Sequence, residues 1–354
     1  MKTVLATLAG VLLLGSTCSA LPPVALSPVA LRAENFTVPP STQPLAFVVV
    51  KNLSNGPYRG SVTMKGPEGW RIAPPARQVE LAPGETGRVP FTIEKGRNVE
   101  ANSYPVEVSA TAAGTTVTRR QDIACASAPY FKPTIDGNPS EWKDAIPISF
   151  TTADKKTTIS TYWNRRQFSI LVAVEEDKLV HYLQSQTESA LFDAVQVAVS
   201  PLDPVADTTD TVAQRAGRFE FLLVSAGDVG GRCFQLATPA TTLAETANVR
   251  TLRSLVYEKA QVAVSRKEGV TYYECGIPFS LMRDAIRPSE GREFFMSVLV
   301  HDPDGTGVRD LGQAAGLWPT QRSASAWSRW MGAKWGKTPP YDNKLRWGLC
   351  TSKY

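Results

Sequence analysis

Large aromatic side chains crowd the C-terminal part of the sequence. Five of the eight tryptophans fall in residues 318–347: Trp318, Trp327, Trp330, Trp335 and Trp347. A flat apolar ring packs against the C–H-rich face of a sugar, and Asp, Gln, Asn and Arg side chains can satisfy the hydroxyl groups. The stretch 325–337 is rich in Gly, Ser and Lys, as in an exposed loop. The pattern indicates sugar binding, with core packing as the alternative for each ring.

An acidic loop could hold a cation. Asp302 and Asp304 lie in an Asp-x-Asp-Gly arrangement, and carboxylate ligands of this kind suit calcium. The residues that follow lack the later ligands and the terminal glutamate of an EF-hand. A plain Asp-Gly turn is the alternative, because both residues favour turns for backbone reasons alone.

Enzyme signatures are missing from the sequence. The two histidines, His181 and His301, assemble no Ser-His-Asp or zinc set, and there is no nucleophile elbow or phosphate loop. Residues 175–177 are all acidic, but neighbours on a strand face opposite ways, which makes a poor carboxylate pair for glycoside hydrolysis. We therefore interpret this cluster as a solvated turn and expect a protein without catalytic activity.

The N-terminal segment indicates export. Residues 1–20 combine a charged start, an apolar centre and a small-residue cleavage site at Ala20, which is typical of a secretory signal peptide. No later segment is long and apolar enough to span a membrane. The formal net charge of +5 is spread along the chain and forms no basic stripe of the kind that nucleic acid requires. We expect a secreted protein that neither spans a membrane nor binds nucleic acid.

Four cysteines remain after removal of the signal peptide. An even number in an oxidising compartment allows two disulfides in three possible pairings. We favour Cys233–Cys275 and Cys125–Cys350. Free buried thiols are the alternative.

The overall pattern predicts an all-β protein of two β-sandwich domains. The 26 prolines and 25 glycines sit mostly between short runs of alternating apolar residues, and helical periodicity is nearly absent. A proline-rich lead, 21–33, is expected to be extended and poorly ordered. The first domain, 34–126, follows this lead and is expected to contain strands at 45–51, 58–65, 78–81, 88–94, 103–110 and 115–122. A spacing of about ten residues fits an immunoglobulin-like sandwich.

Three motifs of this first domain resemble small immunoglobulin-like domains that are appended to bacterial glycosidases. They are the strand Gly60–Thr63, a Pro-x-Gly-Trp turn that ends at Trp70, and the turn Pro83-Gly84-Glu85 before the next strand. Trp70 is expected to cap a small core, because one large aromatic after a turn is usually buried in such a domain.

The second domain, 127–354, resembles the family 9 carbohydrate-binding modules and their wider relatives, the DOMON-type sandwiches. The matching motifs are an Ile-Asp-Gly turn at 135–137, the pair Glu141-Trp142, the strand 190–199, the Glu-x-x-Ile-Pro-Phe strand end at 274–279, the strand 294–300 into the Asp-rich loop, and a closing strand at 345–350. Their order implies a jelly-roll-like sandwich. Further strands are expected at 157–163, 168–174, 218–225, 231–236, 249–252, 255–258 and 261–266, with a helical turn at 279–285.

The resemblance also implies a sugar-binding site. In that family a stacking tryptophan precedes the closing strand, which falls here on Trp330 or Trp335, with Trp327 beside them. The sequence departs from the family at Ala190-Leu191, where a second stacking tryptophan is found. The two-ring arrangement of the family is therefore in doubt.

Three polar residues complete the implied site. Gln196 falls near the position of a hydrogen-bonding glutamate and offers both donor and acceptor atoms. Asp193 could orient a sugar hydroxyl or cap a turn. Arg309 could donate to ring hydroxyls or form a surface ion pair.

Three functions follow from these observations. The first is a secreted, non-catalytic protein that binds a polysaccharide or oligosaccharide. The second is a haem-binding electron-transfer domain, since some DOMON-type sandwiches hold haem through Met and His, for which His301 leaves room. The third is a structural or assembly protein at the cell surface without a sugar ligand, which the missing tryptophan near Ala190 favours. Glycosidase activity comes last. The sugar, its linkage and the oligomeric state stay open.

Overall fold

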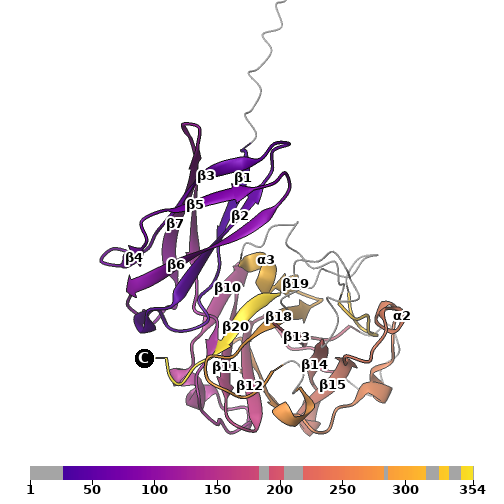
Figure 1. Ribbon diagram of the computed structural model, residues 1–354. Helices are drawn as coiled ribbons and strands as arrows, with labels where there is room; N and C mark the ends of the chain where they lie inside the picture. The colour runs from indigo at the N-terminus through magenta and orange to yellow at the C-terminus, as the bar shows by residue number, and fades with distance from the viewer. Residues whose placement is uncertain are drawn as a thin grey trace, which may run out of the picture.

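The chain folds into two β-sandwich domains, drawn one above the other in Figure 1. A computed structural model describes residues 27–182, 191–202, 218–282, 286–315, 327–334 and 344–353. The strands confirm the predicted all-β class. The expected signal peptide, 1–20, lies outside the described residues. None of the described helices has the length and apolar character needed to cross a membrane.

The first domain packs two four-stranded sheets together. Their strand orders are β1-β2-β6-β4 and β5-β3-β7-β8. The bounds are β1 Val29–Ala33, β2 Leu45–Asn52, β3 Tyr58–Lys65, β4 Arg71–Ala73, β5 Arg77–Leu81, β6 Thr86–Lys95, β7 Tyr104–Ala112 and β8 Thr115–Ile123. All six expected strands are present, because apolar residues alternate with polar ones and face the core. Trp70 packs on Phe36 and Tyr104 at ring-centroid distances of 5.9 and 5.4 Å, in agreement with the structural role expected for it.

The first strand lies inside the segment that was expected to be a poorly ordered lead. β1 pairs with β2 along its whole length, from Val29 opposite Asn52 to Ala33 opposite Val48. On the other edge of β1, the side-chain amide of Gln121 on β8 contacts Ala33. It accepts the Ala33 N–H and donates to the Ala33 carbonyl, each at 3.0 Å. The expectation was wrong for this strand, since pairing with distant residues outweighs the local proline content.

The second domain packs a five-stranded sheet on a seven-stranded sheet. Their orders are β10-β11-β12-β17-β16 and β15-β14-β13-β18-β20-β9, with β19 beside β18. The bounds are β9 Ser127–Ala128, β10 Ile148–Thr152, β11 Lys155–Trp163, β12 Gln167–Glu175, β13 Ala194–Pro201, β14 Phe219–Ser225, β15 Gly231–Ala237, β16 Gln261–Lys267, β17 Val270–Pro278, β18 Glu293–Asp302, β19 Gly307–Asp310 and β20 Leu345–Leu349. The short helices α2 and α3 span Leu243–Ala247 and Leu311–Ala314. The core lies between the sheets and is built from alternating apolar side chains.

Two expected strands of this domain are absent. Residues 249–252 and 255–258 form no strand; instead a 3-10 turn spans Leu252–Leu255, and Val256 makes a single bridge to Phe234. Leu252 is buried in a cluster on the outer side of the seven-stranded sheet. Leu252, with Leu255 packed against the same cluster, therefore serves a tertiary contact and not a strand.

The acidic cluster at 175–177 is not the fully solvated turn that the sequence predicted. Glu176 is buried and accepts a hydrogen bond from the Thr271 hydroxyl. Burial raises the pKa of Glu176 to about 8. The neighbouring Asp177 stays exposed and pairs with Lys155 at 2.5 Å, so the interpretation was wrong for Glu176 alone.

The four described cysteines are free, buried thiols, as the alternative to disulfides had it. Cys233 on β15 and Cys275 on β17 belong to facing sheets, and burial together with the neighbouring Cys275 thiol raises the pKa of Cys233. Cys125 and Cys350 share the core of the first domain. The favoured partners therefore lie in common surroundings, but neither pair is bonded, so the two expected disulfides are not confirmed.

Continuous pairing joins the two domains. Phe36 of the first domain bridges Cys125, and the residues just after Cys125 form β9, which pairs in parallel with β20. Asn102 reinforces the junction with a 2.9 Å hydrogen bond to the Cys125 carbonyl. Ile146 and Cys350 of the second domain complete the core of the first. The junction is thus a packed interface and not a loose linker.

Candidate functional site

The outer face of the seven-stranded sheet carries a buried polar cluster. Side chains alternate along β13, so Val195 and Val197 face the core while Gln196 faces outward. Its amide donates to the Glu220 carboxylate on β14. On the other side, the Nε2 atom of His301 on β18 lies 2.9 Å from Gln196 Oε1.

Residues 327–334 complete this cluster. Ser328 donates its backbone N–H and its hydroxyl to the two carboxylate oxygens of Glu220, each at 2.9 Å. The indole N–H of Trp330 donates to Gln196 Oε1 at 3.0 Å. One ring, one amide and one carboxylate are thereby tied together on a single sheet face.

A second ring joins the cluster through a buried ion pair. The Arg218 guanidinium lies 3.1 Å from Glu220 and 5.0 Å from the ring centroid of Trp327. The sequence reasoning missed Arg218, Glu220 and Ser328. A signal for the first two existed, because Arg218 and Glu220 alternate with the core residues Phe219 and Phe221.

Exposed rings were expected near Trp330 and Trp335, with core packing as the alternative for each ring, and the structure contradicts exposure at Trp330. Trp327 and Trp330 keep only 1% and 2% of their surface exposed. Trp330 packs on Phe192 and against the edge of His301, with ring centroids 5.2 and 5.1 Å apart. These partners come from distant parts of the chain. Trp335 lies outside the described residues.

His301 has a structural partner in this cluster. Burial lowers its pKa to about 3, so the imidazole is neutral. Since its Nε2 is already engaged by Gln196, the contact favours a hydrogen-bonding role over the haem ligation that the sequence left open.

Arg309 is not available to a sugar. It is fully buried, and all five of its N–H groups have protein acceptors. They are Asp302 Oδ2 at 2.8 Å, Thr306 Oγ1 at 2.6 Å, Thr157 Oγ1 at 3.2 Å, and the carbonyl oxygens of Glu175 at 2.8 Å and Lys156 at 3.4 Å. Both expected roles, sugar donor and surface ion pair, are corrected to a buried ion pair with Asp302.

Asp193 ties its segment to that of Val180, 13 residues earlier in the chain, a contact that matches neither of its two expected roles. Its Oδ2 accepts the N–H of Val180 at 2.5 Å, and its own N–H donates to the Val180 carbonyl at 3.0 Å. Its Oδ1 is buried without a hydrogen-bond partner among the described residues. Burial and the nearby carboxylates of Asp304 and Asp302 raise the pKa of Asp193 to about 7.

The same residue joins the two acidic residues of the expected calcium loop. One carboxylate oxygen from each of Asp193, Asp302 and Asp304 lies within 4.8 Å of the others. Calcium takes about six to eight oxygen ligands. The three carboxylates, with the unpartnered Asp193 Oδ1, could supply some of them, while Asp302 Oδ2 is already engaged by Arg309 and Thr306. Lys178, 2.8 Å from Asp304, balances part of the negative charge in the free protein. A bound ion would tie β13 to the loop after β18.

Calcium is expected to stabilise the protein through these three carboxylates. At a hundredfold excess over the Kd, binding to the folded state alone should raise the melting temperature by about 5 °C. Asp304→Asn changes an exposed side chain and should abolish that shift, whereas Asp154→Asn, at another exposed turn of this domain, should retain it. Thermal unfolding in calcium chloride and in EDTA measures the effect. A shift that survives Asp304→Asn would assign calcium to another place.

The first domain matches a known family. Residues 38–113 match the NPCBM-associated, NEW3 domain of alpha-galactosidase, which confirms the predicted glycosidase-associated domain. Among solved structures, a family 9 carbohydrate-binding module (CBM9) from Caldicellulosiruptor kristjanssonii in complex with glucose aligns at 13% identity over 51% of this chain and 78% of that chain, with a TM-score of 0.32.

Two further structures align at similar levels. A CBM9 from the same organism in complex with cellotriose aligns at 14% identity over 52% of this chain and 80% of that chain, with a TM-score of 0.33. The E. coli chaperone DraB aligns at 12% identity over 38% and 68%, with a TM-score of 0.21. Scores this low carry no argument about the ligand. No curated protein matches the chain.

Proposed function

We propose that the protein is a secreted, non-catalytic protein that binds carbohydrate on the outer face of its seven-stranded sheet. The observation that carries the proposal is the meeting of Trp327, Trp330, Gln196 and Glu220 on that face. The match of residues 38–113 to a domain of alpha-galactosidase supports it from outside the site. The signal-peptide pattern of residues 1–20 supports secretion.

The chemistry of the site is an exchange of hydrogen bonds. In the free protein Gln196 Oε1 accepts from the Trp330 indole, and Glu220 accepts from Ser328. These side chains are buried in the free protein, so binding requires residues 327–334 to move away from the sheet. A sugar hydroxyl both donates and accepts, so it can then take the place of either partner, while the apolar face of the sugar packs on an indole. Because one set of hydrogen bonds replaces another, the net gain is modest and stacking contributes much of the affinity.

Trp330→Phe is expected to lower carbohydrate affinity about tenfold or more, because the substitution removes the indole N–H and part of the ring. Phenylalanine is chosen because truncation of a buried tryptophan to alanine costs about 3–5 kcal/mol and would unfold the site. The full mature chain would be tested against insoluble cellulose, xylan and soluble oligosaccharides by pull-down and calorimetry.

The matched control is Trp347→Phe. Trp347 is equally buried but faces the core, where its indole donates to Thr161 Oγ1 at 2.9 Å. It should lose a similar amount of stability and keep wild-type affinity. Equal losses of affinity in both variants would place the effect in folding and remove the outer face as the site.

A second candidate function has one observation in its favour. Trp327 and Trp330 are both buried, as in a structural or assembly protein without a sugar ligand. Absence of binding to every carbohydrate in the panel, by a folded wild-type protein, would select this function.

A further inference from the structure

A surface groove of about 390 Å³ lies beside the C-terminal strand of the second domain. It is lined by residues from four separate segments: Tyr130, Trp163, Arg165, Ser289, Glu290 and Thr351. None of them belongs to the polar cluster on the outer face of the seven-stranded sheet. The volume falls within the range of about 300–1,000 Å³ that is usual for small-molecule sites.

Two aromatic residues line the groove, and backbone pairing holds them together. Tyr130 keeps 46% of its surface exposed, although it is a large aromatic residue. Its ring packs at 85° against Trp163, with centroids 4.9 Å apart, and the two residues form a parallel bridge. The Tyr130 N–H also donates to the Thr351 carbonyl at 3.2 Å. An aromatic ring fixed in this way offers contact area at a low cost in conformational entropy.

Trp163, the second aromatic residue of the groove, is held in place by two hydrogen bonds. Its indole N–H donates to the Cys350 carbonyl at 2.8 Å, and its backbone N–H donates to the Pro129 carbonyl at 3.0 Å. Only 5% of its surface is exposed. Trp163 therefore holds the Tyr130 ring through an edge-to-face contact, and Tyr130 keeps the larger exposed surface of the two.

The rim of the groove supplies polar groups of both kinds. Arg165 is exposed, and within the described part of the chain its guanidinium has no ion-pair partner. Glu290, also exposed, accepts a hydrogen bond from the Thr351 hydroxyl, and Ser289 adds another hydroxyl. One positive and one negative side chain leave the rim without net charge, so it suits a neutral polyhydroxylated ligand better than an anion.

We infer that this groove is a second carbohydrate subsite, in which one sugar ring stacks on Tyr130 while Arg165 and Glu290 bind its hydroxyl groups. The inference rests on the proposed function of the protein and adds a second contact for a long chain. Two linked contacts raise the apparent affinity for a polysaccharide well above that for a short oligosaccharide, provided that the chain spans both.

The test compares Tyr130→Ala with Phe131→Ala in the full mature chain. Phe131 is the matched control, because it is similarly exposed at 43% but packs against Tyr162, 5.0 Å away, outside the lining of the groove. Affinity electrophoresis in gels with hydroxyethylcellulose or soluble xylan measures the long-chain affinity, and calorimetry with cellobiose and xylobiose measures the short-ligand affinity. Tyr130→Ala should weaken the long-chain affinity about fivefold to tenfold, and Phe131→Ala should leave it unchanged.

The outcomes separate the two sites. A loss in Tyr130→Ala with unchanged binding in Trp330→Phe supports the groove and removes the outer face. A loss in Trp330→Phe with wild-type affinity in Tyr130→Ala overturns the groove alone. Equal losses in Tyr130→Ala and Phe131→Ala overturn it as well, since the effect then lacks specificity. A wild-type protein that binds neither polysaccharide overturns both.

Discussion

Arg309→Leu is expected to lower the free energy of unfolding by about 3–5 kcal/mol, because it leaves a buried carboxylate without its ion-pair partner. Asp302 is buried and receives the Arg309 guanidinium at 2.8 Å. Burial alone would raise the pKa of Asp302. Hydrogen bonds from Thr306 and Arg309 outweigh this effect and lower the pKa. The substitution also removes the Arg309 N–H that donates to the Glu175 carbonyl. Urea unfolding monitored by circular dichroism measures the change.

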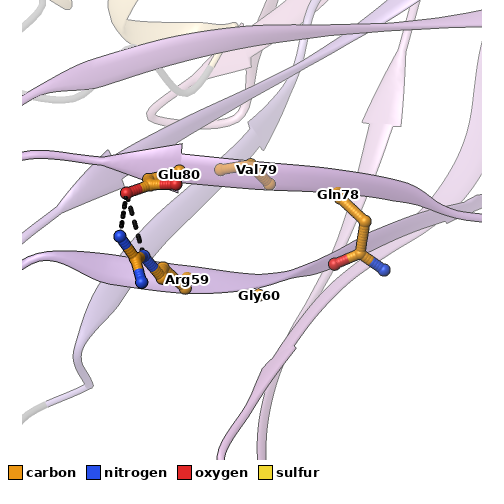
Figure 2. A pocket seen from close by; sticks show the side chains of 5 residues that line it. All are labelled: Arg59, Gly60, Gln78, Val79 and Glu80. Carbon is orange, nitrogen blue, oxygen red and sulfur yellow. Dashed lines mark hydrogen bonds and ion pairs between the residues drawn. The ribbon is translucent and has the colours of Figure 1, made fainter.

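The matched control is an arginine with equally good geometry at the surface. Arg59 on β3 binds Glu80 on β5 at 2.6 Å, and both residues line a surface pocket of about 410 Å³ (Figure 2). Both side chains are largely exposed, so Arg59→Leu should cost less than about 1 kcal/mol. Similar losses for Arg59→Leu and Arg309→Leu would mean that burial of the Arg309 pair is not the cause.

Glu274→Ala is the second substitution with a large expected effect. The buried Glu274 carboxylate accepts the backbone N–H groups of Asp136 and Gly137, at 3.1 and 2.7 Å, and the indole N–H of Trp142 at 2.8 Å. Each donor left without an acceptor costs about 1–3 kcal/mol, so we expect a loss of at least about 3 kcal/mol. Urea unfolding monitored by circular dichroism measures it.

Two variants bracket this result. Glu274→Gln keeps one acceptor oxygen and should lose less stability than Glu274→Ala, whereas Glu258→Ala removes an exposed carboxylate of the same domain and should change stability by less than about 0.5 kcal/mol. A Glu274→Ala protein as stable as Glu258→Ala would show that water satisfies the three donors.

The Glu274 contacts explain why the order of motifs in the second domain was informative. The Ile-Asp-Gly turn and the Glu141-Trp142 pair are near neighbours in the sequence, whereas the Glu-x-x-Ile-Pro-Phe strand end is distant, with Glu274 132 residues after Trp142. In the structure they meet at one carboxylate. These residues resemble a family motif because their hydrogen bonds hold the turn against β17. The motif therefore indicates the fold of the domain and not its ligand.

The strands could be predicted from the sequence, whereas the surroundings of the site could not. Alternation is a local property, and strands such as 58–65 and 115–122 follow it to within a residue or so. The burial of Trp330 depends on Phe192 and His301, which no local pattern connects to it. The strand expected at 249–252 is absent for the same reason, since Leu252 serves a tertiary contact.

Charge placement was the other limit. Gln196 was singled out by position, and its neighbour Glu220 was not, although both lie on the same face. Arg309 was left open between a sugar donor and a surface ion pair, because it matches a basic position after the Asp-rich loop of the resembled family. Its burial follows from five acceptors, two of which are backbone carbonyls of residues 156 and 175, and backbone carbonyls leave no trace in a sequence.

The packed junction between the domains bears on how the chain folds as it is synthesised. N-terminal domains generally fold first as they emerge from the ribosome. Here Ile146 and Cys350 fill part of the core of the first domain, and β9 finds its partner only when β20 arrives. The first sandwich therefore emerges with an open end to its core, and that end closes only after nearly all of the second sandwich has been translated.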